Sequence, residues 1–299
     1  MAGLVIKARG RELDVSDRPW LMGVVNVTPD SFSDESGMKS VDDRVALASK
    51  LLSEGADIID IGGESGVTNA PAVEAEAEAE RVVPVIKRVV DELGAVVSVD
   101  TYKPLVARAA LEAGALIIND VSGLRDPELA TVCAEYKAGL VVMHTRAAPK
   151  EKLLDRSMDG KMLADVVDFL EERIEFAVSN GVGRDSIITD PGPDFGKTPA
   201  QTVEVLRGIE EIEKLGHPVL LAVSRKDFIG AATSRPPRER EAGTLAALGW
   251  AISRGNYIFR VHDVAACRDF ITVQRLLEGK EDLPPDTMLA EELRRVKRS

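Results

Sequence analysis

Eight short apolar segments alternate with eight longer segments of helical periodicity, and this alternation limits the possible folds more than any other feature. Most apolar segments are continuous Val, Ile and Leu runs, typical of parallel strands covered on both faces. The expected strands are 20–27, 56–63, 95–101, 116–121, 139–145, 186–191, 218–224 and 257–262. The expected helices are 41–54, 72–93, 104–113, 127–136, 160–180, 199–215, 238–254 and 264–277. We predict an α/β fold, a single (β/α)8 TIM barrel, with an open doubly wound sheet as the alternative.

The two ends of the chain depart from this repeat. Residues 4–15 contain an Arg9-Gly10 turn between two short runs, which predicts a hairpin that caps the amino-terminal mouth of the barrel. Beyond Gly279 the chain becomes charged and contains Pro. We therefore expect residues 1–279 to form the barrel and 280–299 to form a charged surface segment with at most one weak helix.

The composition indicates a soluble globular protein with small partners. With 299 residues, 44% hydrophobic content and a formal charge of -12, the chain can bury a large core but does not suit a nucleic acid or an anionic membrane. Cys133 and Cys267 lie in helical patterns without metal-ligand spacing, so we expect buried thiols in a reducing compartment. No apolar run is long enough to cross a bilayer, and we expect a cytoplasmic location.

Polar residues occupy nearly every expected strand end. Any one of them can be a helix cap or a satisfied loop residue. In barrels of this type, however, catalytic groups lie at the carboxyl ends of the strands. Together they therefore predict one site. The residues are Asn26, Glu64, Asp100, Asn119, His144, Asp190, Ser224, Arg225, Lys226, Arg260 and His262.

The chemistry of this set suits a flat, amide-rich heterocycle. Asp190 and Asn119 can pair with a guanine-like edge, because a carboxylate accepts two parallel N–H bonds and an amide both donates and accepts. Lys226 offers a donor to a ring carbonyl or ring nitrogen. Arg260 can stack its guanidinium on the ring while it donates to a phosphate, which Lys cannot do.

The same mouth can also hold a polyanion. Residues 26–34 come at the end of the first apolar run and offer amide, hydroxyl and carboxylate oxygens. Such oxygens suit a hard cation or a phosphate ester. An ordinary loop that caps the next helix has the same composition, so this alternative stays open. His262 and Asn26 would complete a polyanion pocket with Mg²⁺, which prefers oxygen ligands and phosphate oxygens.

Seven segments, in order, resemble the signatures of the dihydropteroate synthase family, and the resemblance covers essentially the whole chain. They are 26–34, 56–65, 98–101, 118–123, 190–197, 224–230 and 260–264. The resemblance implies that pyrophosphate is displaced from 6-hydroxymethyl-7,8-dihydropterin diphosphate by p-aminobenzoate to give 7,8-dihydropteroate. It also implies a homodimer formed through the last barrel helices.

The resemblance further assigns roles to individual residues. The pterin would be held by Asp100, Asn119, Asp190, Lys226 and Arg260. The catalytic residues would be Asp100, Lys226 and Arg260, with no side-chain nucleophile. The p-aminobenzoate end would be lined by Phe195, Ser224 and Arg225. The pyrophosphate would be contacted by Asn26, Arg260 and His262, and Asn26 would ligate Mg²⁺.

Two departures from the family pattern keep other functions open. Gly66 and Val67 stand where the family has Thr and Arg, so one cation beside the pyrophosphate is missing. Asp194 replaces a Gly near the substrate, where its carboxylate can repel the p-aminobenzoate carboxylate or bond a different group. The first alternative is a diverged paralogue that binds a pterin with little or no synthase activity. The second is a pterin-dependent methyltransferase domain, which does not explain Ser224 to Lys226 or Arg260 to His262.

Overall fold

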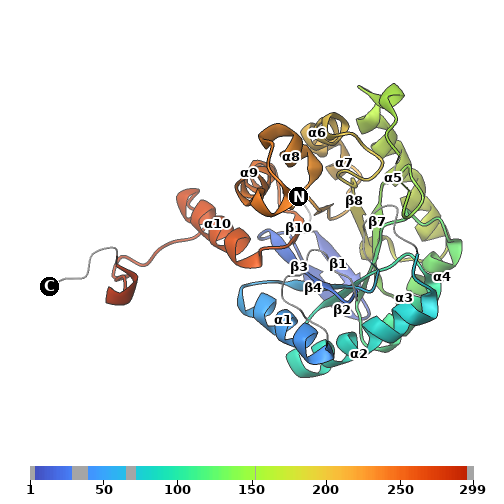
Figure 1. Cartoon of the computed structure of the whole chain (residues 1–299), viewed down its shortest axis with the longest axis horizontal. Coiled ribbons are helices and arrows are strands. Elements are labelled where there is room, and N and C mark those ends of the chain that lie inside the picture. Colours follow the sequence, from blue (N-terminus) through green and yellow to red (C-terminus); the bar gives the residue numbers. More distant parts are fainter. Residues whose placement is uncertain (1–3, 29–39, 65–71, 152, 295–299) are drawn as a thin grey trace.

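Parallel strands form a nearly closed barrel in the computed structural model, which describes residues 4–28, 40–64, 72–151 and 153–294 (Figure 1). The strands of the barrel are β3 (Trp20–Asn26), β4 (Ile58–Gly62), β5 (Val97–Asp100), β6 (Ile117–Asp120), β7 (Gly139–Met143), β8 (Ile187–Asp190), β9 (Leu220–Leu221) and β10 (Ile258–Val261). Their order in the sheet is β8-β7-β6-β5-β4-β3-β10-β9. A parallel bridge between Thr189 and Val219 joins the two ends of the sheet. The predicted TIM barrel is confirmed, and the open doubly wound sheet is wrong.

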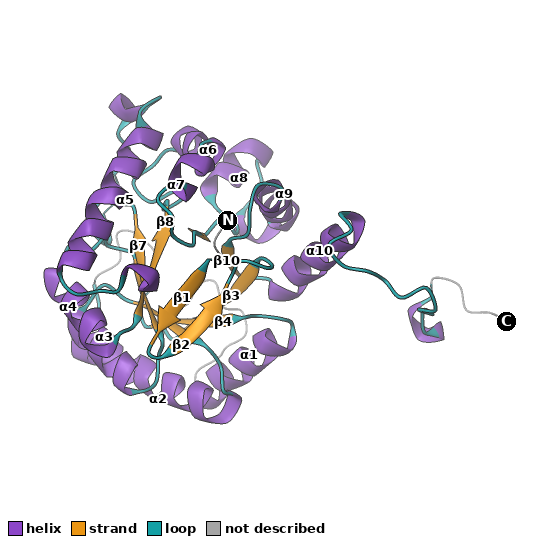
Figure 2. Cartoon of the chain, turned by 180° about the vertical axis from the view of Figure 1, so that it is seen from behind, coloured by secondary structure: helices purple, strands orange, loops and turns teal. Residues whose placement is uncertain are grey.

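Helices surround the barrel on its outer side, as expected for strands that are apolar on both faces (Figure 2). They are α1 (Val41–Ser53), α2 (Ala75–Leu93), α3 (Pro104–Glu112), α4 (Pro127–Tyr136), α5 (Met162–Ser179), α6 (Pro199–Arg207), α7 (Ile209–Glu213), α8 (Asp227–Thr233), α9 (Glu241–Ile252) and α10 (Val264–Leu277). Most coincide with the predicted helices to within a few residues. The layer of helices thus leaves the strand ends as the open faces of the barrel.

The helices differ from the prediction at two places. The predicted helix 199–215 is two helices that meet at Gly208, where a side chain would collide with Leu163: an added Cβ would lie 2.1 Å from its Cδ2. The helix α8 was not predicted, because its seven residues are too few to give a clear 3.6-residue period. Both features belong to the half of the barrel that carries the loops after β8 and β9.

A short antiparallel hairpin closes the amino-terminal mouth, as predicted. Its strands are β1 (Val5–Ala8) and β2 (Arg11–Asp14). Ile6 and Leu13 belong to one buried cluster with residues such as Ile58 and Ile117 at the start of the barrel strands. A second, larger cluster fills the space between strands and helices and contains both cysteines as buried free thiols. The carboxyl ends of the strands are therefore the open end of the barrel.

The chain beyond α10 runs away from the barrel (Figures 1 and 2). In this segment, as far as residue 294, the regular structure is a 3-10 turn at Glu291–Leu293. Leu283, Met288 and Leu289 expose 64%, 76% and 55% of their surface. Across the described ranges, no helix combines the length and apolarity needed to cross a membrane.

The hairpin is expected to contribute strongly to stability. Ile6 is fully buried, so Ile6→Ala should lower the free energy of unfolding by about 2–5 kcal/mol through lost burial and an unfilled cavity. Urea denaturation measures this change. The exposed neighbour Glu12 is the control, and Glu12→Ala should change stability by less than about 0.5 kcal/mol. Equal effects of the two substitutions would show that the hairpin does not seal the core.

Candidate active site

The register of the sheet brings the predicted site residues to one level at the open end. Asn26 lies opposite Gly62, Gly62 opposite Asp100, and Asp100 opposite Asn119 in adjacent parallel strands. Gly62 leaves a gap between its neighbours: an added Cβ would lie 3.5 Å from Cβ of Asp100 and 3.9 Å from Oδ1 of Asn26. The two side chains therefore flank one space above β4.

A charged cluster occupies the centre of this level. Arg260 on β10 donates from Nε to Oδ2 of Asp60 at 2.7 Å and from Nη2 to Oδ2 of Asp100 at 2.9 Å. Asn119 donates from Nδ2 to the same oxygen of Asp60 at 3.2 Å. One guanidinium thus faces two carboxylates. Burial raises the pKa of Asp100, and the charge of Asp60 raises it further against the opposing effect of Arg260.

Asp60 is a site residue that the sequence analysis missed. Its side chain is fully buried, and its Oδ1 has no hydrogen-bond partner among the described residues. A buried charge is costly unless it is paired, so a carboxylate inside the apolar run Ile58-Ile59-Asp60-Ile61 was a usable signal. Its partner Arg260 is 200 positions away in the chain, and the sequence alone does not indicate that pairing.

Asp190 and Lys226 form the opposite side of the site. Asp190 ends β8, is 3% exposed and accepts a hydrogen bond from the Gly192 amide at 2.7 Å. Burial raises its pKa to about 6, against the effects of that amide and of Lys226. Burial also lowers the pKa of Lys226, although the neighbouring carboxylates of Asp194 and Asp190 favour its charged form.

The residues predicted for the aromatic-amine end come from two neighbouring loops. Nζ of Lys226 lies 4.5 Å from the ring centroid of Phe195, within range of a cation–π contact. Arg225 approaches Glu241, with Nε 3.6 Å from Oε2. The loop after β8 therefore contacts the loop after β9 through these predicted residues.

Ser224 and His262 form a polar pair at the edge of the same region. Oγ of Ser224 lies 2.9 Å from Nδ1 of His262. His262 has an exposed face, but the protein atoms around its imidazole desolvate it and lower its pKa, and the positive charges of Arg260 and Arg225 lower the pKa further. The imidazole is therefore neutral at neutral pH, which permits the Ser224 hydroxyl to donate to it.

Both carboxylate oxygens of Asp194 are hydrogen-bonded within the protein. Its Oδ2 accepts a hydrogen bond from the backbone amide of Asp227 at 2.5 Å, and its Oδ1 accepts one from the Thr202 hydroxyl at 3.0 Å. Asp194 thus bonds groups of the protein, which is one of the two alternatives that the sequence left open, and its effect on the p-aminobenzoate carboxylate stays a prediction.

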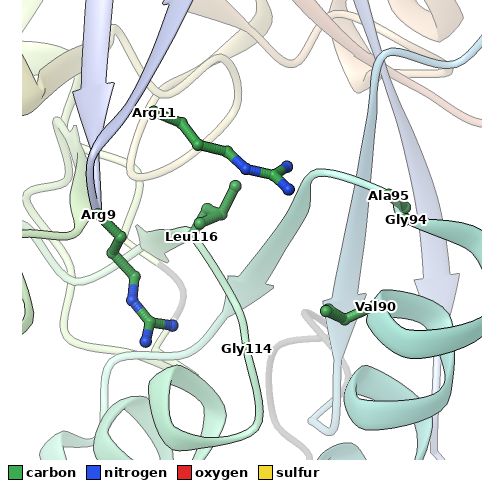
Figure 3. Close-up of a pocket in the computed structure, with 7 residues that line it drawn as sticks. All are labelled: Arg9, Arg11, Val90, Gly94, Ala95, Gly114 and Leu116. Carbon is green, nitrogen blue, oxygen red and sulfur yellow. The ribbon is translucent and has the colours of Figure 1, made fainter.

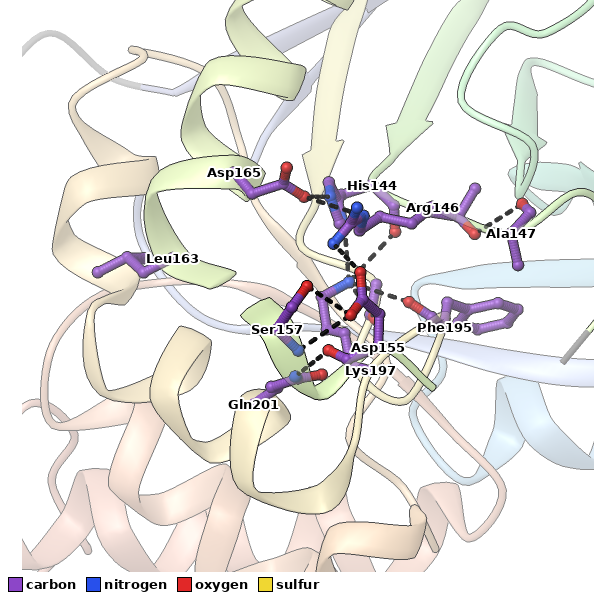
Figure 4. Close-up of polar contacts among 12 residues, drawn as sticks. His144, Arg146, Ala147, Asp155, Ser157, Leu163, Asp165, Phe195, Lys197 and Gln201 are labelled. Carbon is purple, nitrogen blue, oxygen red and sulfur yellow. Dashed lines mark hydrogen bonds and ion pairs between the residues drawn. The ribbon is translucent and has the colours of Figure 1, made fainter. Parts of the chain in front are cut away.

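Behind the site, the predicted strand-end residue His144 has two partners that the sequence analysis did not predict, Asp165 and Lys197. His144 lies between Asp165 and Lys197, with Nε2 3.0 Å from Oδ2 of Asp165 and Nδ1 2.6 Å from Nζ of Lys197 (Figure 4). Lys197 also donates to the carbonyls of Gly192 and Phe195 at 2.9 and 3.2 Å. Burial lowers the pKa of Lys197 to about 7 and that of His144 well below its usual range. These three side chains support the loop after β8.

Glu64, another strand-end residue, is engaged in ion pairs. Its carboxylate lies 2.5 Å from Nζ of Lys103 and 2.9 Å from Nζ of Lys150. Lys103 also contacts Glu78 at 2.5 Å and the Val73 carbonyl at 2.6 Å. Glu64 is therefore part of a structural cluster.

The rest of the first signature, 29–34, and the departures at Gly66 and Val67 lie outside the described residues.

A cavity of about 260 Å³ lies at the other end of the barrel, next to the hairpin (Figure 3). Arg9 and Arg11 line it, together with Gly94 and Gly114 after α2 and α3. Nη1 of Arg9 donates to the carbonyls of Leu111 and Ala115 at 2.6 and 2.7 Å. The Arg9 guanidinium thus completes the carboxyl-terminal turn of α3 and is not arranged to hold a ligand.

Comparisons with known proteins identify the family of the chain. Residues 22–262 match the model of the family described as pterin binding enzyme. A dihydropteroate synthase from Bacillus subtilis is 44% identical over 261 residues, which are 87% of this chain and 89% of the relative. The chain belongs to the dihydropteroate synthase family. The match extends from β3 to His262 and therefore includes every predicted site residue.

Solved structures of dihydropteroate synthases share the fold. The enzyme from Xanthomonas albilineans with 4-aminobenzoic acid superposes with a TM-score of 0.84 at 42% identity, covering 93% of this chain and 99% of that chain. The same enzyme in complex with 7,8-dihydropteroate gives a TM-score of 0.80 at 42% identity, covering 92% and 98%. This chain thus shares its fold with these solved structures over almost its entire length.

The raised pKa of Asp190 predicts that ligand-free stability falls with pH. Its folded pKa of about 6 exceeds the unfolded value near 4, so its contribution is complete below pH 4 and is lost as pH rises to about 6. Asp190→Asn should therefore raise the free energy of unfolding at pH 7.5 by about 1–3 kcal/mol and have little effect at pH 4. Urea titrations at both pH values measure this difference.

The exposed carboxylate Asp168 on α5 provides the matched control. Asp168→Asn should change stability by less than about 0.5 kcal/mol at either pH. A stability gain in Asp190→Asn that is the same at pH 4 and pH 7.5 would contradict a raised pKa of Asp190 in the folded protein.

Proposed function

We propose that this chain catalyses the condensation of 6-hydroxymethyl-7,8-dihydropterin diphosphate with p-aminobenzoate to give 7,8-dihydropteroate and pyrophosphate. The main support is the convergence of Asp100, Asn119, Asp190, Lys226 and Arg260 at one barrel mouth, in a chain that belongs to the dihydropteroate synthase family. The reaction is a transfer of the pterin methylene carbon from a diphosphate oxygen to an aromatic amine.

The pterin is assigned to the buried part of the site. Asp190 accepts from the exocyclic amine and a ring N–H, while Asn119 both donates and accepts at the same edge. Lys226 donates to the ring carbonyl or a ring nitrogen. These roles suit the burial of Asp190 and Asn119, at 3% and 2% exposure, because hydrogen bonds shielded from water discriminate strongly among ligands.

Asn26 suits a Mg²⁺ ion held together with the diphosphate. Its amide oxygen is a hard donor, and Mg²⁺ in phosphate sites takes one or two protein ligands and completes its shell with phosphate and water. The described residues include no cluster of three or more His, Cys, Asp or Glu side chains able to hold a metal alone. When bound, the ion would supply positive charge for the leaving pyrophosphate.

The residues of the chain support a dissociative displacement. Arg260 and His262 stabilise the departing pyrophosphate, and Asp100 offsets positive charge that develops on the pterin ring. Phe195 and Ser224 bind and orient the amine and exclude water, which would otherwise compete as the nucleophile. No covalent bond between substrate and protein is required.

The proposal includes a homodimer in the cytoplasm, with p-aminobenzoate as the second substrate. Val273 and Leu277 on α10 expose 56% and 84% of their surface, which suits burial against a second copy. Two buried free thiols suit a reducing compartment.

The central test is an assay of the purified protein with the pterin diphosphate, p-aminobenzoate and Mg²⁺. Dihydropteroate and pyrophosphate should form in equal amounts. Asp190→Ala should weaken pterin binding by about 1.5–3 kcal/mol, measured by calorimetry, because the ring donors lose a charged acceptor. Tight pterin binding without either product would favour the paralogue, and unchanged affinity in Asp190→Ala would show that the pocket is misassigned.

The loop departure generates a separate prediction. If the cation missing at position 67 matters in the transition state, Gly66→Thr combined with Val67→Arg should raise turnover by roughly tenfold to a hundredfold, or about 1.5–3 kcal/mol. Dihydropteroate formed per second at saturating Mg²⁺ is the measurement. Fast turnover of the parent that slows in the double variant would mean that the present loop is a working alternative.

A further inference from the structure

Asp194 adopts a backbone conformation that normally favours glycine. Its φ is +68°, in the left-handed region, where a side chain is strained. Such a conformation persists only when surrounding contacts hold it in place. We therefore expect contacts around Asp194 that hold this conformation.

Three hydrogen bonds hold the residue. Its backbone amide donates to Oγ1 of Thr202 at 3.0 Å, and that hydroxyl donates back to Oδ1 at 3.0 Å. Thr202 is fully buried on α6. The remaining oxygen, Oδ2, accepts from the Asp227 amide at 2.5 Å.

The bond to Asp227 connects two loops. Asp227 is the first residue of α8, and Lys226 at its N-cap makes no side-chain capping bond. Asp194 supplies the acceptor from the loop after β8 instead, which satisfies one of the free amides at the start of a helix. Both loops carry site residues, because Phe195 follows Asp194 and Lys226 precedes Asp227.

Lys197 anchors the other side of the same loop. It donates to the carbonyls of Gly192 and Phe195 from a position that is 2% exposed. The peptide of Phe195 is thus fixed between Lys197 and the bonds of Asp194, while its ring faces Nζ of Lys226 at 4.5 Å.

We propose that Asp194 is a positioning residue that latches the loop carrying Phe195 to the loop carrying Lys226, and thereby presets the aromatic-amine end of the site. This inference rests on the proposed function for the identity of the substrates. The latch itself rests on the observed hydrogen bonds.

The carboxylate has a second effect, on the charge of Lys226. Burial lowers the pKa of this ammonium group, and the charge of Asp194 opposes that effect. The other charged groups that act on Lys226 are Asp190 on β8, Asp227 on α8 and Arg260 on β10. The charge of Lys226 in turn lowers the pKa values of Lys197 and His262. Loss of the Asp194 charge should therefore let Lys226 lose its proton at lower pH.

Two substitutions separate the bond from the charge. Asp194→Gly suits the positive φ and removes both. Asp194→Asn removes the charge and keeps one oxygen acceptor for the Asp227 amide, while its Nδ2 can donate to Oγ1 of Thr202 in place of the bond that the carboxylate accepted. Asp286→Asn, at an exposed carboxylate in the C-terminal segment, controls for net charge. The measurements are steady-state kinetics for each substrate and amide hydrogen exchange of segments 190–198 and 225–233.

For Asp194→Gly we expect faster exchange in both segments and a KM for p-aminobenzoate about threefold to tenfold higher, with the KM for the pterin diphosphate within about twofold of the parent. Asp194→Asn should keep the exchange rates and KM values of the parent and move the alkaline limb of kcat/KM to lower pH. Asp286→Asn should match the parent in every measurement.

Parent-like exchange and KM in Asp194→Gly would overturn the latch. So would an Asp194→Asn variant that loses protection as fully as the glycine variant, because its acceptor oxygen would then be irrelevant. A parent protein that makes no dihydropteroate would instead overturn the proposed function, and hydrogen exchange in the two segments would still decide whether Asp194 joins the loops.

Discussion

The pairing of Arg260 with Asp60 and Asp100 is the interaction on which the site depends. A carboxylate inside the barrel, fully buried as Asp60 is, is tolerated only beside a compensating charge. Arg260 provides that charge from β10, across β3, and Asn119 provides a further hydrogen bond. The cluster therefore ties together β4, β5, β6 and β10 at the level where substrate is expected to bind. Loss of any member would leave a buried polar group without its partner.

The fold could be predicted from the sequence because its signals are local. Continuous apolar strands, helices of regular period and polar strand ends all lie within short windows of the chain, and parallel strands in a barrel must bring their ends to one mouth. Asp100, Asn119, Asp190, Lys226 and Arg260 were accordingly identified as neighbours. By contrast, α8 was missed because its residues carry little periodicity and the acceptor for its first amide, Asp194, comes from another loop.

The missed site residues depend on pairings that no local pattern records. Asp60 becomes meaningful only once Arg260 is known to lie beside it, and Lys197 only once His144 and two loop carbonyls surround it. The role of Asp194 is a similar case. Sequence comparison indicated a misplaced charge, but the direction of its side chain depends on Thr202 and on the start of α8.

The hairpin closes the amino-terminal mouth, so contacts that stabilise the fold lie at one end of the barrel and the charged site lies at the other. The apolar contacts of the hairpin contribute to folding, whereas the burial of the Asp190 carboxylate at the opposite mouth opposes folding when that group is charged. Substitutions at sites that share no contacts usually have additive effects on stability. Improved packing around Ile6 could therefore offset a destabilising change beside Asp190 without altering the geometry of the site. The closed end of the barrel thus gives the open end freedom to evolve new substrate preferences.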